Sequence, residues 1–245
     1  METNSALLSI QTGLYGLSFY MEQNGDGIFN RIPYETATVS GLDEILEKIT
    51  DELWRNFHPA KVVVLHHHEL NAFVPAELFV PEKAKEFLRY NVKLLPSDTV
   101  EADTGLPYDT VNVFVPYENV NNFFIDRFGE IEFHHSASAF LKYAAGLTAG
   151  QTDVFVRFSE KDFQMLILNP DELLFYNRFP METQDDFLYY FFFVWEKREL
   201  NRLAPQVFLL GDEKQRLAAR ENLRDFITGV HELPEAEKEI LKVFL

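Results

Sequence analysis

The sequence predicts an α/β fold in which one order of elements occurs twice along the chain. Each half contains three strands in a meander, a helix, a strand and a second helix. Apolar residues alternate or run together in the strand segments, and they recur at helical spacing between them. Helices that alternate with short apolar strands are typical of an α/β fold, and the doubled order indicates a duplicated one. No residue-level repeat accompanies this order.

The first half opens with the strand meander. Residues 7–21 form two strands, and Gly25–Gly27 has the composition of a hairpin turn into a third strand at residues 28–34. Residues 40–57 place apolar side chains on one helical face, which predicts a helix. Residues 61–67 contain a continuous apolar run, as in a strand buried on both faces of a sheet.

The remainder of the first half is less regular. A helix is expected around residues 81–91, a polar irregular piece at 96–107 and a strand at 109–117. We expect a first lobe of residues 1–117 and a second lobe of residues 118–245, each with a mixed sheet flanked by helices.

The second lobe repeats the order in altered form. Its expected strands are residues 130–135, 153–159, 162–169, 172–179 and 206–212. Its expected helices are residues 119–128, 136–147, 185–200, 213–227 and 234–245. Ser136 is a candidate cap for one of these helices, and Thr183 with Asp186 caps another.

The composition limits the classes of partner and compartment. The 39 acidic residues against 22 basic residues leave a formal net charge of −17, which argues against nucleic acids and anionic membranes as partners. The chain contains no cysteine, so disulfides and thiolate sites are excluded, as suits a reducing compartment. The longest wholly apolar or aromatic run, Phe187–Trp195, reaches about half of the roughly 20 residues that cross a bilayer. We therefore expect a cytoplasmic protein without membrane insertion.

Two features of the chain carry a resemblance to a known superfamily. The doubled element order covers nearly the whole chain. The segment "GEIEFHHSASAFLKYAAGL" at residues 129–147 is similar to the strand and helix that open the second half of bacterial pilus-assembly and cell-division actin homologues. The chain thus resembles the actin-like ATPase superfamily, whose fold is ribonuclease H-like. More narrowly, it resembles a Bacteroidetes family known as domain of unknown function 3822, which has a fold of this kind.

The resemblance implies where a nucleotide would bind. In the superfamily the first hairpin carries an Asp, a Gly and a Thr or Ser, and these positions fall on Ser9, Gln11 and Thr12. Gly13 lies one or two places late. The Asp helps to orient magnesium, and the Gly lets backbone amides approach phosphate oxygens closely. Only the hydroxyl is kept here, so the first hairpin is expected to be structural.

The other segments of the implied nucleotide cleft are altered as well. In the matching second hairpin, Val156 and Phe158 stand near the position of the acid, and the hairpin has no glycine. The adenosine segment keeps Gly211 but follows it with Asp212, whose charge opposes a polyanion. The resemblance therefore implies a vestigial nucleotide cleft. Its candidate positions are Thr12, Gly13, Ser159 and Gly211.

Preserved architecture with altered phosphate positions predicts a non-catalytic protein that works as a binding or scaffold module. We expect another protein as its partner, and neither a catalytic residue nor a cofactor. The alternative is an enzyme, either an atypical nucleotide-dependent phosphotransferase or ATPase, or a metal-assisted hydrolase. Convergent Asp, Glu or His side chains would favour the enzyme. A cleft filled by Phe or Tyr, together with an apolar surface patch, would favour the module.

The run His66–His68 suggests a metal site. On a strand, His66 and His68 share one face while His67 points the other way, so at most two imidazoles converge locally. His134 and His135 would add ligands if their strand were adjacent, which the sequence does not determine. Because zinc takes three or four ligands, we favour a structural role and expect no metal.

Two further motifs have simple structural interpretations. Asp103–Gly105 is the aspartic-protease triplet, but it occurs once, between polar residues, and is predicted to be an acidic loop. The aromatic run Phe187–Trp195 predicts a helix buried between layers. The alternative for this run is that one face of the helix binds a partner protein.

Overall fold

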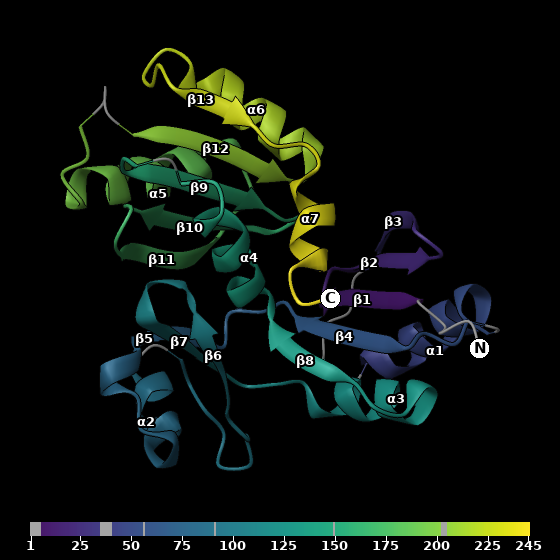
Figure 1. Cartoon of the computed structure of the whole chain (residues 1–245). Helices are drawn as coiled ribbons and strands as arrows, with labels where there is room; N and C mark the ends of the chain where they lie inside the picture. Colours follow the sequence, from purple (N-terminus) through teal and green to yellow (C-terminus); the bar gives the residue numbers. More distant parts are fainter. Residues whose placement is uncertain (1–5, 35–40, 56, 91, 149, 202–204) are drawn as a thin grey trace. The chain divides into compact units, whose positions relative to one another are not determined.

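The computed structural model describes residues 6–34, 41–55, 57–90, 92–148, 150–201 and 205–245. The chain forms two compact units, one of Met1–Phe140 with Ile240–Leu245 and one of Leu141–Glu239 (Figure 1). This division lies later than the predicted boundary after residue 117. The reason is strand β8 (Glu132–His135), which pairs with a strand of the first unit.

The main sheet of the first unit has five strands in the order β3-β2-β1-β4-β8. They are β1 (Leu7–Gly13), β2 (Gly16–Gln23), β3 (Asp26–Pro33), β4 (Lys61–His66) and β8. The first three strands pair antiparallel, which confirms the predicted meander. Strand β1 pairs with β4 in parallel, and β4 pairs with β8 in parallel.

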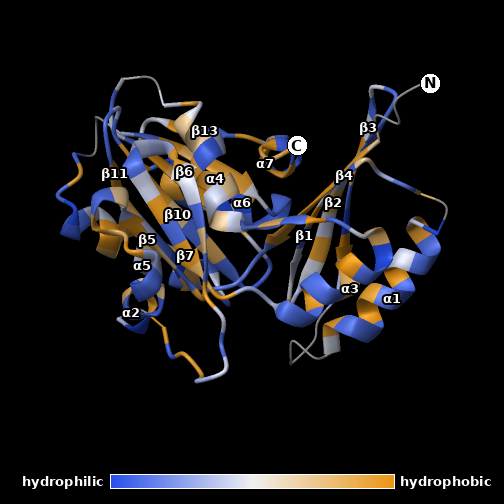
Figure 2. Ribbon diagram, turned by 60° about the horizontal axis from the view of Figure 1, so that its bottom comes forward, coloured by the Kyte–Doolittle hydropathy of each residue, from blue (hydrophilic) through white to orange (hydrophobic). Residues whose placement is uncertain are grey.

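Two helices pack on this sheet, α1 (Leu42–Leu53) and α3 (Glu118–Phe128). They lie side by side, and each carries apolar residues along one stripe (Figure 2). The shared core contains Ile10, Leu46 and Phe124, each of which is fully buried. This burial confirms the amphipathic helix that the apolar spacing in residues 40–57 predicts.

A smaller sheet in the first unit has the order β5-β7-β6. Its strands are β5 (Asn71–Pro75), β6 (Glu101–Leu106) and β7 (Thr110–Phe114), and all its pairs are antiparallel. The helical segments nearby are η2 (Ala76–Leu78), η3 (Pro81–Lys83), α2 (Ala84–Arg89) and η4 (Pro107–Asp109). The prediction of an irregular piece at 96–107 is wrong for β6, because pairing with β7 orders a polar segment whose own pattern gives only a weak strand signal.

The second unit repeats the topology of the first. Its sheet has the order β11-β10-β9-β12-β13. The strands are β9 (Asp153–Phe158), β10 (Asp162–Leu168), β11 (Leu173–Pro180), β12 (Gln206–Gly211) and β13 (Val230–Glu232). The first three again pair antiparallel, and β9–β12 and β12–β13 pair in parallel. The matching strand orders confirm the duplicated α/β fold.

Helices α5 (Gln184–Lys197) and α6 (Glu213–Leu223) pack on the core of the second unit. The capping box that Thr183 and Asp186 predict is present at the start of α5. Helices α4 (Ser136–Ala145) and α7 (Ala236–Lys242) each run across a boundary between the units. Over the described ranges, every helix is too short or too polar to cross a membrane.

Candidate functional site

Thr12 lies at the end of β1 and is completely buried. Its Oγ1 is 3.0 Å from the hydroxyl oxygen of Tyr34. Its carbonyl oxygen accepts a hydrogen bond of 2.9 Å from the backbone N–H of His67. The hydroxyl of Thr12, the group that the resemblance assigns to phosphate, is therefore paired with a tyrosine of the chain itself.

Gly13 follows directly and packs against the same backbone. A Cβ atom at this position would lie 2.6 Å from the carbonyl oxygen of His67, closer than side chains approach. The glycine is needed because the end of β1 and the segment after β4 are in direct backbone contact. This close approach accounts for Gly13 without a phosphate.

The two candidate positions of the second unit, Ser159 and Gly211, also make backbone contacts. The N–H of Ser159 donates to the carbonyl oxygen of Asp162, at 2.9 Å, and closes the turn between β9 and β10. Gly211 ends β12 with φ of 92°, and a Cβ there would overlap the carbonyl oxygen of Phe158. Only glycine combines this positive φ with so close an approach.

Asp212 follows Gly211 and caps helix α6. Its carboxylate accepts a hydrogen bond of 3.1 Å from the N–H of Gln215, and its own N–H donates to the carbonyl oxygen of Phe158 at 2.9 Å. A helix N-terminus is a ready site for a phosphate. Here the carboxylate of Asp212 already accepts a hydrogen bond from one of the backbone N–H groups that such a phosphate would use.

The two histidine runs lie side by side. The sequence alone did not determine this adjacency. Strands β4 and β8 are parallel neighbours, with His66 opposite His135. The imidazoles nevertheless bond to protein groups: His66 Nε2 donates to Asn121 Oδ1 at 2.9 Å, and His68 Nδ1 accepts from the N–H of Leu70 at 3.1 Å. Among the described residues, no three His, Asp or Glu side chains converge as metal ligands.

Asp103 is the feature that the sequence reading missed. The triplet at 103–105 is not an acidic loop, because Asp103 is buried on β6 and accepts three hydrogen bonds. Its donors are His134 Nδ1 at 2.8 Å, the N–H of His135 at 2.9 Å and the Ser138 hydroxyl at 2.5 Å. The carboxylate thus ties β6 to β8 and α4. The apolar Ala102 and Leu106 around it were the weak signal of a strand.

Helix α5 divides its aromatic residues between two environments. Phe187 and Phe191 are completely buried, as the core prediction requires. Tyr189 and Phe193 are 65% and 48% exposed, and their rings stack with centroids 6.3 Å apart. One face of the helix therefore belongs to the core and the other presents aromatic rings to solvent.

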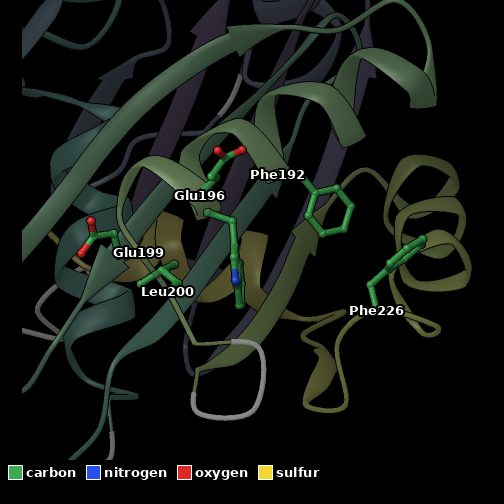
Figure 3. A pocket seen from close by; sticks show the side chains of 6 residues that line it. Phe192, Glu196, Glu199, Leu200 and Phe226 are labelled. Carbon is green, nitrogen blue, oxygen red and sulfur yellow. The ribbon is translucent and has the colours of Figure 1, made fainter.

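A pocket of about 540 Å³ lies at the end of α5. Figure 3 shows Phe192 and Phe226 on one side of it and Glu199 with Leu200 on the other. Its lining residues are Phe192, Trp195, Glu196, Glu199, Leu200 and Phe226. The pocket is built entirely from the second unit, and it is aromatic inside and acidic at the rim.

Comparison with protein families identifies the chain. The model of the family described as "Protein of unknown function (DUF3822)" matches residues 1–230. The chain belongs to this family. No curated protein matches the sequence.

Comparison with solved structures shows the actin-like ATPase fold. A Bacteroides thetaiotaomicron protein with this fold and unknown function superposes with a TM-score of 0.85 at 18% identity, covering 98% of this chain and 97% of that one. A chain of the PilM–PilN type IV pilus biogenesis complex superposes with a TM-score of 0.61 at 10% identity, covering 94% of this chain and 89% of that one. The ethanolamine utilization protein EutJ from Carboxydothermus hydrogenoformans superposes with a TM-score of 0.56 at 7% identity, covering 100% of this chain and 91% of that one. At these identities the likeness concerns the fold, and the predicted resemblance is confirmed.

The close backbone contact at Gly211 generates a stability prediction. Gly211→Ala should lower the free energy of unfolding by about 3 kcal/mol, because it combines a positive φ with overpacking against Phe158. Gly146→Ala is the matched control, since its Cβ would lie 3.4 Å from the carbonyl oxygen of Tyr143. Gly146→Ala should change the free energy of unfolding by less than about 1 kcal/mol. Urea unfolding measures both, and equal losses would contradict the assignment.

His66 generates a pH prediction. Burial lowers its pKa to about 4, although the Asn121 hydrogen bond and the charge of Asp103 act in the opposite direction. The unfolded chain, with a pKa of about 6.5, takes up this proton first as the pH falls. The contribution of His66 to stability is therefore complete above pH 6.5 and is lost towards pH 4, by roughly 3 kcal/mol.

His66→Gln should flatten this part of the pH dependence. We expect the unfolding free energy of the variant to fall less steeply than that of the wild type between about pH 6.5 and 4. The difference in slope should correspond to the uptake of up to about one proton on unfolding. Urea unfolding at a series of pH values measures the slopes. Parallel curves for the two proteins would show that His66 is protonated equally in the folded and unfolded states.

Proposed function

We propose that the chain is a non-catalytic member of the actin-like ATPase fold and works as a protein-binding or scaffold module. The observation that carries the proposal is that each candidate phosphate position is engaged by the chain's own backbone or side chains. Thr12 bonds to Tyr34 and His67, and Gly13 packs on the His67 carbonyl. Gly211 packs on Phe158 in the same way.

The electrostatics of these positions support the same proposal. Ser9 stands where the resemblance places a magnesium-orienting Asp, and it is completely buried on β1. Asp212 adds a negative charge at the N-terminus of α6, the place where a phosphate group would be bound. Two like charges a few ångströms apart, without a metal between them, repel each other by several kcal/mol at an effective dielectric constant of about 20.

A protein is the partner that the surface favours. Exposed aromatic rings such as those of Tyr189 and Phe193 are typical of protein interfaces. The net charge of −17 opposes binding to nucleic acids and anionic membranes. PilM, a protein of related fold, was solved in a complex with PilN, which supports protein binding as a use of this fold. The cysteine-free composition supports a cytoplasmic location.

The enzyme alternatives gain no support from the described residues. A metal-assisted hydrolase needs three or more converging ligands, and no such set occurs among the described residues. His66 bonds to Asn121, His68 and His135 bond to backbone groups, and His134 bonds to the Asp103 carboxylate. A phosphotransferase needs free amides and a metal-orienting carboxylate at the strand ends. The amides of His67 and Asp212 instead donate to backbone carbonyl groups.

A thermal unfolding titration tests the proposal. Magnesium-ATP at up to about 10 mM should leave the midpoint within a degree of that seen with magnesium triphosphate, the control for ionic effects. A nucleotide at 100 times its dissociation constant stabilises by about 2.7 kcal/mol, which is a shift of several degrees for a chain of this size. A saturable shift with ATP that triphosphate does not reproduce would overturn the non-catalytic assignment.

A further inference from the structure

We propose that the pocket at the end of α5 binds an arginine or lysine side chain of a partner protein. This inference rests on the proposed function, because it names the chemistry of the partner. The pocket is the one formed by Phe192, Trp195, Glu196, Glu199, Leu200 and Phe226.

The interior of the pocket suits the apolar stem of a long cationic side chain. The rings of Phe192 and Phe226 meet edge to face, with centroids 5.3 Å apart. Phe226 is 52% exposed, so one of its sides remains open to a ligand. Lysine and arginine bury their methylene stems on such surfaces while the charged head stays near water. Aromatic faces also attract the cation itself.

The rim of the pocket supplies the complementary charge. Glu196 and Glu199 are both exposed and lie three residues apart at the end of α5 (Figure 3). Within the described ranges, no Lys or Arg forms an ion pair with either carboxylate. Among the described residues, the two cations that follow Glu196 contact other rings, since Lys197 lies over Phe193 and Arg198 over Phe175.

The buried wall of the pocket is a tryptophan. Trp195 lines the pocket and is only 4% exposed, and its Nε1–H has no hydrogen-bond acceptor among the described residues. Buried indole N–H groups normally find an acceptor. The Nε1 atom itself is enclosed by protein, so Trp195 serves as a wall of the pocket and offers a ligand apolar atoms, not this N–H.

The surface beside the pocket extends the same interaction. Phe193 and Tyr189 continue along α5 as exposed rings, so a bound segment that carries apolar residues beside its cation would cover them as well. The surplus of acidic residues over the whole chain favours the approach of a basic segment. Together these features fit a partner segment with a cation between apolar residues.

Tryptophan fluorescence tests the inference directly, because Trp54 and Trp195 are the two tryptophans of the chain. In Trp54→Phe, the emission reports on the pocket alone. We would titrate an acetylated and amidated pentapeptide, Ala-Leu-Arg-Phe-Ala, against the same peptide with neutral citrulline in place of arginine. The arginine peptide should change the emission saturably and bind at least about tenfold more tightly, a difference of about 1.4 kcal/mol.

Charge-neutral variants show where the cation binds. Glu196→Gln with Glu199→Gln should weaken binding of the arginine peptide about tenfold and leave the citrulline peptide unchanged. Glu172→Gln with Glu213→Gln removes the same charge elsewhere in the second unit and should have little effect. Calorimetric titration of the wild type provides the affinity if Trp54→Phe, a core substitution, impairs folding.

Three outcomes would overturn the inference. Equal binding of the two peptides would show an apolar pocket without cation selectivity, and no binding of either at millimolar concentration would show no peptide site. Acetyl-arginine amide that binds as tightly as the pentapeptide would assign the pocket to a small cation instead of a partner protein. None of these results bears on the nucleotide question, which the ATP titration decides separately.

Discussion

Direct backbone contact at the ends of the central parallel strands is the constraint on which the remaining features depend. In the first unit β1 and β4 are parallel neighbours, and Gly13 allows the end of β1 to touch the backbone that follows β4. In the second unit β9 and β12 have the same relation, and Gly211 allows β12 to touch Phe158. Each contact is fixed by a hydrogen bond, from the amide of His67 in one case and of Asp212 in the other. Ligands of open α/β sheets bind outside these strand ends, and the proposed loss of nucleotide chemistry rests on the contacts at these ends.

The rest of each unit holds these strand ends in place. Antiparallel meanders extend the sheets on one side, and aromatic cores hold the helices on their faces. In the first unit a buried carboxylate, Asp103, fixes the smaller sheet to β8 through His134 and His135. In the second unit α5 buries Phe187 and leaves Phe193 in solvent. An actin-like ATPase fold is thus combined with backbone contacts at the strand ends and exposed aromatic rings on α5.

Local sequence patterns predicted most helices and strands, but they did not predict contacts between residues that are distant in the sequence. Hairpin turns and apolar alternation predicted both meanders, and Thr183 with Asp186 predicted the start of α5. Strand β6 was missed because its order comes from pairing with β7 and from hydrogen bonds that join Asp103 to residues about thirty positions later. The pocket could not be predicted, because Phe192 and Phe226 meet only after α6 has folded back. Altered residues at Ser9 and Gln11 were visible in the sequence, but the complete burial of Ser9 was not.

The most direct test of the account is the response of four backbone amides to magnesium-ATP, followed by NMR in the intact protein. The amides are those of Gly13, His67, Gly211 and Asp212. Closed strand ends predict that their chemical shifts and hydrogen-exchange protection stay the same from zero to about 10 mM magnesium-ATP, because their positions are held by backbone contacts and offer nothing to a phosphate. Saturable shifts at these amides, with faster exchange at His67 or Asp212, would show that the strand ends open to a nucleotide and would contradict the account.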